Sequence, residues 1–428
     1  MEKFVNNFLK EEYYKETLDN GLTVYVMPKK QYCNVSGMLM VNYGSFDNEF
    51  IPIDGDEFIK VPYGVAHFLE HKMFENENGE DVTLVFSDLG IEANAFTSYD
   101  KTAYTFSGPD NVNEAIITLL DFVQKPCFTE ESVEREKSII EQELLMYLDQ
   151  DKTVARQHIL ENMYKDEPIT IEIGGTVDSI KKIDKKTLLK CYNSFYHPKN
   201  TVLVIVGGID PEEIINLVKE NQSKKKFPEY KEIKRKEITY SNSLSTKYSE
   251  STFDVTKPIV LVGQKFEYKK ASMGETFKIN TTLELLMDIY FSMTSELVDE
   301  LKEQNLYDNS FSYALNYYGD YAYLYVMSVC DEEEKFIEIV KRTLDKMACN
   351  DIPKDKFLKI QRATQTSNIK SLNSVTFLSN ILANLHFGNL NLFDAIELPG
   401  QITYEDLMEA RNHLKEKLIT VHIVKPNN

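Results

Sequence analysis

Residues 64–75, GVAHFLEHKMFE, place two of the chain's seven histidines four positions apart, with a glutamate directly before the second. On a helix, positions i, i+3 and i+4 share one face, so His67, Glu70 and His71 project in the same direction. Two imidazoles one turn apart can bind one metal ion, and the carboxylate can then act on water as a general base. The stretch therefore predicts a zinc hydrolase site whose residues run in the reverse order to HExxH.

The alternative interpretation is a half-buried helix face whose histidines are satisfied by hydrogen bonds. Because the 428 residues hold few histidines, a chance HxxEH is roughly a 1% event. The rarity of the pattern favours the metal site over the structural alternative.

A catalytic zinc site normally has three protein ligands and one open position. The helix predicted over 129–150 offers a third ligand, because Glu143 lies on an apolar face, where an ionised group needs a partner or a metal. Its neighbours on that face are Ile139, Ile140, Met146 and Tyr147. Glu136 lies two turns earlier on nearly the same line and suits a supporting role. The alternatives are a buried salt bridge for Glu143 and a solvated surface charge for Glu136.

The composition narrows the classes of function. Five widely spaced cysteines without a CxxC pair argue against a disulfide framework and a thiolate metal site. The formal charge of −20 disfavours nucleic acid and would favour encounter with basic peptides. The opening MEKFVNNFLKEEYYKE lacks the apolar core of a signal peptide, and TVLVIVGGI is too short to span a bilayer. We therefore expect a cytoplasmic protein without a membrane partner.

The order of predicted elements occurs twice along the chain, which indicates two copies of one α+β unit. We expect a zinc-binding catalytic domain over 1–222, a Lys- and Ser-rich linker over 223–250, and a homologous domain without the metal motif over 251–428. The first copy comprises strands within 21–44, helices near 64–75, 80–88, 111–124, 129–150 and 184–194, a strand pair within 93–108, and a strand over 200–208. The second comprises strands at 258–266, 309–318, 321–330 and 418–425, with helices near 276–304, 332–348 and 353–372 and a final helix before the last strand.

These residues resemble the insulinase (pitrilysin) family of inverted-motif zinc peptidases, in its short two-domain branch that includes mitochondrial processing peptidase. The resemblance spans the chain and is strongest over 20–210. The segments that carry it are NGLTVYV, VNYGSFDN, YGVAHFLEHKMFE, ANAFTSYDKTAYTF, EREKSIIEQE and FYHPKNTVLVIVGG. It implies two homologous domains, each a mostly antiparallel mixed sheet packed with helices, that form half of a clamshell.

The resemblance also implies roles for individual residues. The family's spacing, in which the third ligand follows the supporting glutamate by seven residues, selects Glu143 over Glu141 and agrees with the helical-face argument. Carried over by position, the zinc ligands are His67, His71 and Glu143, the general base is Glu70, and the supporting carboxylate is Glu136.

Substrate, by the same resemblance, binds as an added strand along Asn94, Ala95 and Phe96. The residues of this segment suit an open edge, although an inner strand is the alternative. In the second half the family carries an Arg and, seven residues later, a Tyr that reach over the substrate. Here Lys302 stands at the Arg position and Tyr307 follows after five residues, and a Lys cannot reproduce the Arg fork.

We therefore expect a zinc-dependent endopeptidase that cleaves peptides or small unfolded proteins in a closing chamber. A homologous sibling would complete the site in a heterodimer, with a homodimer as another possibility. The alternatives are a processing subunit dedicated to one precursor and a non-catalytic scaffold of the same fold. The chain most resembles a cytosolic bacterial group connected in part with modification of elongation factor P, a role that these residues do not reveal.

Overall fold

The computed structural model describes residues 1–238, 240–266 and 271–427, which fold into two compact units. Each unit combines segments from both halves of the chain. Unit 1 consists of Met1–Leu144, Ile171–Glu237 and Ile369–Phe393, and unit 2 consists of Leu145–Thr170, Ile238–Asn368 and Asp394–Asn428.

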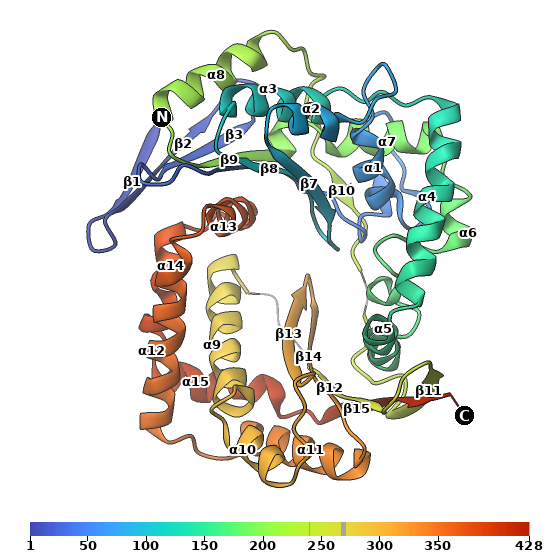
Figure 1. Ribbon diagram of the computed structural model, residues 1–428, viewed down its shortest axis with the longest axis vertical. Helices are drawn as coiled ribbons and strands as arrows, with labels where there is room; N and C mark the ends of the chain where they lie inside the picture. The colour runs from blue at the N-terminus through green and yellow to red at the C-terminus, as the bar shows by residue number, and fades with distance from the viewer. Residues whose placement is uncertain (239, 267–270, 428) are drawn as a thin grey trace. The chain divides into compact units, whose positions relative to one another are not determined.

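The sheet of unit 1 has the strand order β1-β2-β3-β9-β4-β8-β7 (Figure 1). Strands β3 and β9 are parallel, and the neighbouring pairs β9-β4, β4-β8 and β8-β7 are antiparallel. The bounds are β1 (Glu2–Asn6), β2 (Glu11–Thr17), β3 (Thr23–Pro28), β4 (Val35–Val41), β7 (Glu92–Thr97), β8 (Thr102–Gly108) and β9 (Thr201–Gly207). Because β7 is the last strand of the order, one of its edges is open to pairing.

Helices cover both faces of this sheet. Every residue of β4 and β9 is buried, as expected for strands that have a cover on each side. Helix α13 packs on β4 and β9, on the face opposite α3 and α8 (Figure 1). The helices of unit 1 are α1 (Val65–Met73), α2 (Val82–Asp88), α3 (Val112–Val123), α6 (Val177–Ile180), α7 (Lys185–Phe195), α8 (Pro211–Ser223) and α13 (Val375–Phe387), with most of α4 (Glu130–Leu148).

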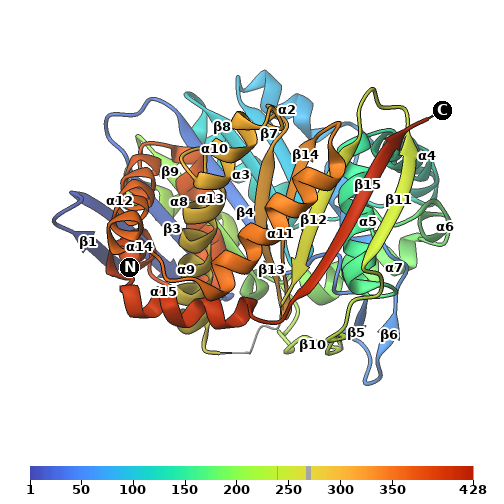
Figure 2. The same cartoon turned by 90° about the horizontal axis from the view of Figure 1, so that it is seen from below.

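The sheet of unit 2 has the order β11-β15-β12-β14-β13, and its strands lie side by side in Figure 2. Its strands are β11 (Tyr248–Phe253), β12 (Ile259–Lys265), β13 (Ser312–Tyr318), β14 (Tyr321–Val329) and β15 (Leu418–Pro426). Its helices are α5 (Asp151–Tyr164), α9 (Met273–Phe291), α10 (Glu296–Glu303), α11 (Glu333–Cys349) and α15 (Tyr404–Ala410), with most of α12 (Lys354–Ser371) and α14 (Leu392–Gln401).

The two sheets share one topology. Both β3-β9 and β11-β15 are parallel, and the three following pairs are antiparallel in each sheet. Helix α13 covers β9 and β4, while α5 covers the corresponding strands β15 and β12. Each half of the chain therefore supplies one helix to the sheet that the other half builds.

The prediction of an α+β chain with repeated, mostly antiparallel sheets is confirmed. The predicted contiguous domains differ from the compact units by the two exchanged segments, Leu145–Thr170 and Ile369–Phe393. The predicted long helix 276–304 is two helices, since Ser292 and Ser295 flank a break where Ser295 caps α10. The α5 helix and the β1-β2 hairpin were not predicted, because neither has a pronounced apolar periodicity.

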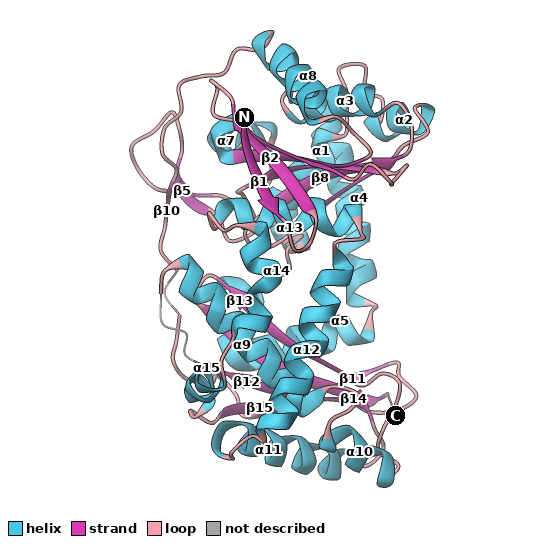
Figure 3. Cartoon of the chain, turned by 90° about the vertical axis from the view of Figure 1, so that its left-hand side faces the viewer, coloured by secondary structure: helices cyan, strands magenta, loops and turns pink. Residues whose placement is uncertain are grey.

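The predicted linker 223–250 is partly structured, and its residue 239 lies outside the described residues. Strand β10 (Lys234–Arg235) pairs with β5 (Glu49–Ile51), beside which it lies in Figure 3, and β5 pairs with β6 (Ile59–Lys60). Arg235 donates to Asp47 over 2.6 Å, which fixes this crossing segment to unit 1. In the described part of the chain, no helix is long and apolar enough to cross a membrane.

We predict that Leu378→Ala, a change in α13, destabilises the sheet built by the first half of the chain. Leu378 is fully buried, and such truncations cost about 2 to 5 kcal/mol. Hydrogen exchange should accelerate in β4 and β9 and stay unchanged in β12 and β14. Leu358→Ala, at an exposed position of α12, is the control. Equal acceleration of hydrogen exchange in both sheets would contradict the conclusion that α13 covers the sheet of the first half of the chain.

Candidate metal centre

Helix α1 carries the HxxEH residues on one face and buries the other. Phe68 and Leu69 are fully buried in the core of unit 1. The helix begins after Gly64, whose φ of 87° favours glycine and whose added Cβ would lie 2.3 Å from the carbonyl oxygen of Gly174. This close approach fixes the start of the helix and hence the direction of His67 and His71.

The structure brings the three predicted ligands together. The Nε2 atoms of His67 and His71 lie 3.7 and 3.3 Å from Oε2 of Glu143, and one ligand atom from each residue lies within 4.8 Å of the others. Ligands about 2.0 to 2.2 Å from one tetrahedral ion are themselves about 3.3 to 3.6 Å apart. Two imidazoles and one carboxylate with this spacing fit zinc, and their role as ligands stays a prediction.

The two histidines have opposite protonation preferences. Burial lowers the pKa of His67 to about 4, with a further contribution from the neighbouring His71, so its imidazole is neutral and able to bind a metal. Burial also lowers the pKa of His71, but hydrogen bonds with Glu136 and Glu143 outweigh it and raise the pKa to about 10. Without a metal, the proton on His71 therefore neutralises part of the charge of the two carboxylates.

Glu136 occupies the predicted supporting position. Its Oε1 atom lies 3.1 Å from Nδ1 of His71, so it accepts a hydrogen bond and orients the Nε2 atom toward Glu143. Glu141 instead lies 3.5 Å from Lys181, away from the histidines.

The apolar face predicted around Glu143 is only partly buried. Ile140 and Leu144 are buried beside it, whereas Ile139 and Met146 are about half exposed. Glu143 nevertheless lies with the two histidines, and its role as a ligand stays a prediction.

A network of ion pairs joins α1 to α4, from a buried lysine to an arginine whose side chain is 55% exposed. Lys72, which follows the second histidine, is fully buried and pairs with Glu75. The other oxygen of Glu75 lies 3.3 Å from Nη2 of Arg135 on α4. This network was not predicted, since nothing in one sequence marks Lys72 as buried.

Glu70, the predicted general base, is 8% exposed and faces strand β7. Burial raises the pKa of its carboxyl group, and a hydrogen bond from Thr97 partly offsets this. The Thr97 hydroxyl donates to Oε2 of Glu70 over 2.6 Å. Thr97 was also missed, because its proximity depends on the packing of α1 against β7.

The predicted substrate residues lie on edge strand β7, beside the metal centre. Asn94 and Ala95 line a cavity of about 450 Å³ together with Glu70 and His71, whereas Phe96 is exposed at 39% and lies outside its lining. Asn94, Ala95 and Phe96 pair with Thr105, Tyr104 and Ala103 of β8. The other edge of β7 is thus available to an added strand, although the binding role of these residues stays a prediction.

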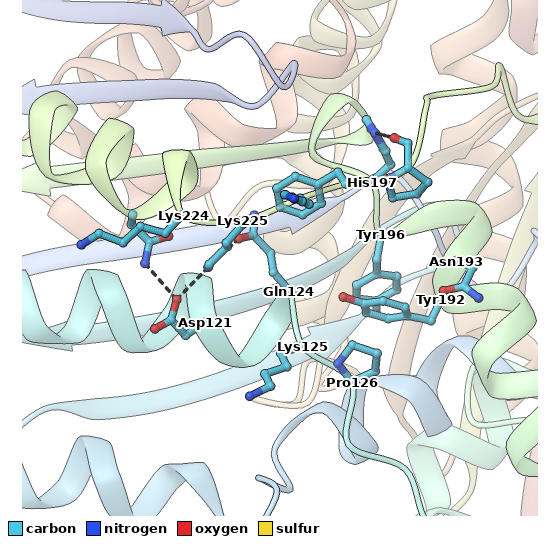
Figure 4. A pocket seen from close by; sticks show the side chains of 14 residues that line it. Asp121, Gln124, Lys125, Pro126, Tyr192, Asn193, Tyr196, His197, Lys224 and Lys225 are labelled. Atoms are coloured by element: carbon cyan, nitrogen blue, oxygen red, sulfur yellow. Dashed lines mark hydrogen bonds and ion pairs between the residues drawn. The ribbon is translucent and has the colours of Figure 1, made fainter.

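A second cavity, of about 660 Å³, lies where α3, α7 and α8 end (Figure 4). Lys225 and Asn221 both contact Oδ1 of Asp121, at 2.7 and 2.8 Å. Lysines are favoured near the C-terminal ends of helices, where the helix dipole is negative, which accounts for the lysines that line this cavity. No predicted site residue lines this cavity, so it is separate from the metal centre.

Comparison with known proteins defines the family. The model for the insulinase family (peptidase family M16) matches residues 60–177, and that for the peptidase M16 inactive domain matches residues 182–364. The chain is 38% identical over 411 residues to an uncharacterized zinc protease, YmfH, of Bacillus subtilis (strain 168), covering 96% of this chain and 95% of that protein. The chain therefore belongs to the insulinase family of peptidases, M16.

Two further relatives extend the comparison. An M16-like peptidase from Alicyclobacillus acidocaldarius has a solved structure with a TM-score of 0.92, 33% identity, and coverage of 97% of this chain and 99% of that one. The mitochondrial-processing peptidase subunit beta of Saccharomyces cerevisiae is 30% identical over 156 residues, which cover 36% of this chain and 34% of that protein. The matched family and the zinc proteases among its relatives agree with the chemistry of the centre.

We predict that Glu136→Gln weakens zinc binding by roughly 10- to 100-fold, because partners that orient metal-bound histidines have effects of this size. Glu134→Gln is the matched control on the same helix, since its side chain is 67% exposed and pairs with Lys137. Competition with a chromophoric chelator measures both affinities. Equal affinity in the two variants would contradict the supporting role.

Zinc binding should release a proton. With a pKa of about 10, His71 is protonated in the metal-free protein at pH 8, whereas an imidazole must be in its neutral form to bind a metal. We expect roughly one proton released per ion at pH 8, and zinc affinity that rises with pH up to about 10. Calorimetry in buffers of different ionisation enthalpy measures the release, and a value of zero would contradict the binding of zinc by His71.

Proposed function

We propose that this protein is a zinc-dependent endopeptidase that cleaves peptides or small unfolded proteins in a chamber that closes. The observation that carries the proposal is the position of the Glu70 carboxylate, between the converged His67, His71 and Glu143 side chains and the open edge of β7. A family of peptidases and a fitting donor set support it independently.

In the proposed mechanism, the substrate backbone pairs with the edge of β7, which provides binding that is independent of side-chain sequence. A bound zinc ion would polarise the scissile carbonyl and lower the pKa of the attacking water. Glu70 accepts a proton from this water and later transfers it to the leaving amine. The raised pKa of Glu70 lies closer to neutral pH, where a carboxyl group can both accept a proton and give it up efficiently.

We also propose that a homologous sibling supplies part of the site, with a homodimer as the other arrangement. Lys302 lies with its Nζ atom 5.2 Å from the ring centroid of Tyr307, whose hydroxyl donates to the sulfur of Met293. Both side chains are thus engaged locally, and Lys302 cannot form the two-pronged contact of an arginine. The name of the yeast relative describes it as a subunit, which supports a multisubunit form here.

The cytoplasm is the proposed compartment. All five cysteines are free thiols, and Cys191 and Cys330 are buried, which suits a reducing environment. The acidic surface makes basic peptides the proposed clients, because it would attract them over long distances.

We predict that Glu70→Gln abolishes peptide cleavage while zinc content is retained, because the amide cannot accept the proton. Loss of a general base typically lowers the rate by roughly 10²- to 10⁴-fold. Cleavage of a mixed peptide library, analysed by mass spectrometry, together with metal analysis of both proteins, provides the test. An active Glu70→Gln variant would contradict the assigned role.

The same library distinguishes the remaining alternatives when it is tested with the chain alone and with its sibling. Cleavage by the chain alone at normal rates would exclude an obligatory heterodimer, and cleavage only with the sibling would support it. Cleavage of one precursor but of no library peptide would indicate a dedicated processing subunit. No cleavage by the zinc-loaded protein would indicate a scaffold.

A further inference from the structure

Strand β7 contributes a second polar group to the centre besides its backbone edge. Thr97 is the last residue of β7 and pairs with Thr102 of β8. Its hydroxyl oxygen lies 2.6 Å from Oε2 of Glu70. Within the described part of the chain, Thr97 is the one side chain that hydrogen-bonds the Glu70 carboxylate.

The direction of this hydrogen bond is fixed by its surroundings. The Thr97 hydroxyl has one hydrogen, and its other neighbour, Oγ1 of Thr102, is 3.5 Å away. Thr102 is fully buried and donates its own hydrogen to the carbonyl oxygen of Tyr43 over 2.9 Å. A carboxylate is the stronger acceptor, and 2.6 Å is typical of O–H bonds to an ionised oxygen. The hydrogen of Thr97 therefore points at Glu70.

We propose that Thr97 is a positioning residue that determines which oxygen of Glu70 exchanges the proton. This inference rests on the proposed peptidase function. The hydrogen bond from Thr97 lowers the basicity of Oε2, so Oε1 is the more basic oxygen and the one assigned as the base. The hydrogen bond also restricts rotation of the Glu70 side chain, because no other described side chain holds its carboxylate.

The proton balance of the step follows from this assignment. An O–H bond of water breaks, the proton binds Oε1 of Glu70, and the electron pair stays on the oxygen that attacks the carbonyl carbon. The Oε1–H bond then breaks as the proton moves to the leaving nitrogen and the C–N bond cleaves. Thr97 keeps its own hydrogen throughout and acts through its hydrogen bond to Glu70.

The position of Thr97 also connects substrate binding with catalysis. Thr97 lies three residues after Asn94 on the strand whose edge is proposed to pair with the peptide. A peptide that adds to this edge restricts the motion of β7, and with it the hydroxyl that holds the base. The strand that binds substrate would thus also position Glu70.

The test compares Thr97→Val with Thr97→Ser in the full-length protein, together with its sibling if cleavage requires one. Valine keeps the shape and strand preference but lacks the hydroxyl, and serine keeps the hydroxyl. We expect Thr97→Val to lower kcat roughly 10- to 100-fold, as for loss of a hydrogen bond to a charged group, with KM and zinc content unchanged. Thr97→Ser should retain most of kcat.

The control is Thr252→Val, a change at an exposed threonine of strand β11, which should leave kcat unchanged. A Thr97→Val variant with wild-type kcat, or a Thr97→Ser variant as slow as Thr97→Val, would overturn the assignment. If the valine variant does not fold, Thr97→Ala compared with Thr97→Ser carries the same test. A wild-type protein that cleaves nothing would overturn the proposed function itself, before the variants are compared.

Discussion

The ion pairs of Glu75, which follows α1 in the chain, link that helix to α4 beside the metal centre. Lys72 is buried completely, and a buried ammonium group requires a charged partner. Glu75 is that partner and also contacts Arg135 on α4. Arg135 directly precedes Glu136 on α4, so this contact lies next to the hydrogen bond between Glu136 and His71. Both contacts join α1 to α4 beside the converged ligand atoms.

A second constraint comes from the strands. Because β4 and β9 are buried on both faces, the sheet that carries β7 is complete only when α13 covers it. Helix α13 belongs to the second half of the chain, and α5 of the first half covers β12 and β15 in return. The second half of the chain is consequently part of the sheet that ends in β7.

The parts of the centre that sequence could predict are those fixed by local geometry. His67, Glu70 and His71 share one face because of the helical repeat, whereas the choice of Glu143 over Glu141 also used the spacing implied by the family resemblance. The buried face predicted for Glu143 was only partly correct, since exposure depends on how α4 packs. Thr97 and the exchanged helices were not predictable from one chain, because both depend on contacts between segments far apart in the sequence. The repeat of the sheets was predictable, since each helix and strand shows a local sequence pattern and the order of these patterns occurs twice along the chain.

The exchange of α5 and α13 has a consequence for how the protein is made. Strand β9 ends at Gly207 and α13 begins at Val375, so roughly 170 residues leave the ribosome after the first sheet could form and before its cover exists. At about 5 to 20 residues per second, this interval lasts on the order of ten to thirty seconds. During that time an apolar sheet face that includes Met38 and Met40 has no helix to cover it. The nascent chain therefore leaves this apolar face uncovered until synthesis is nearly complete.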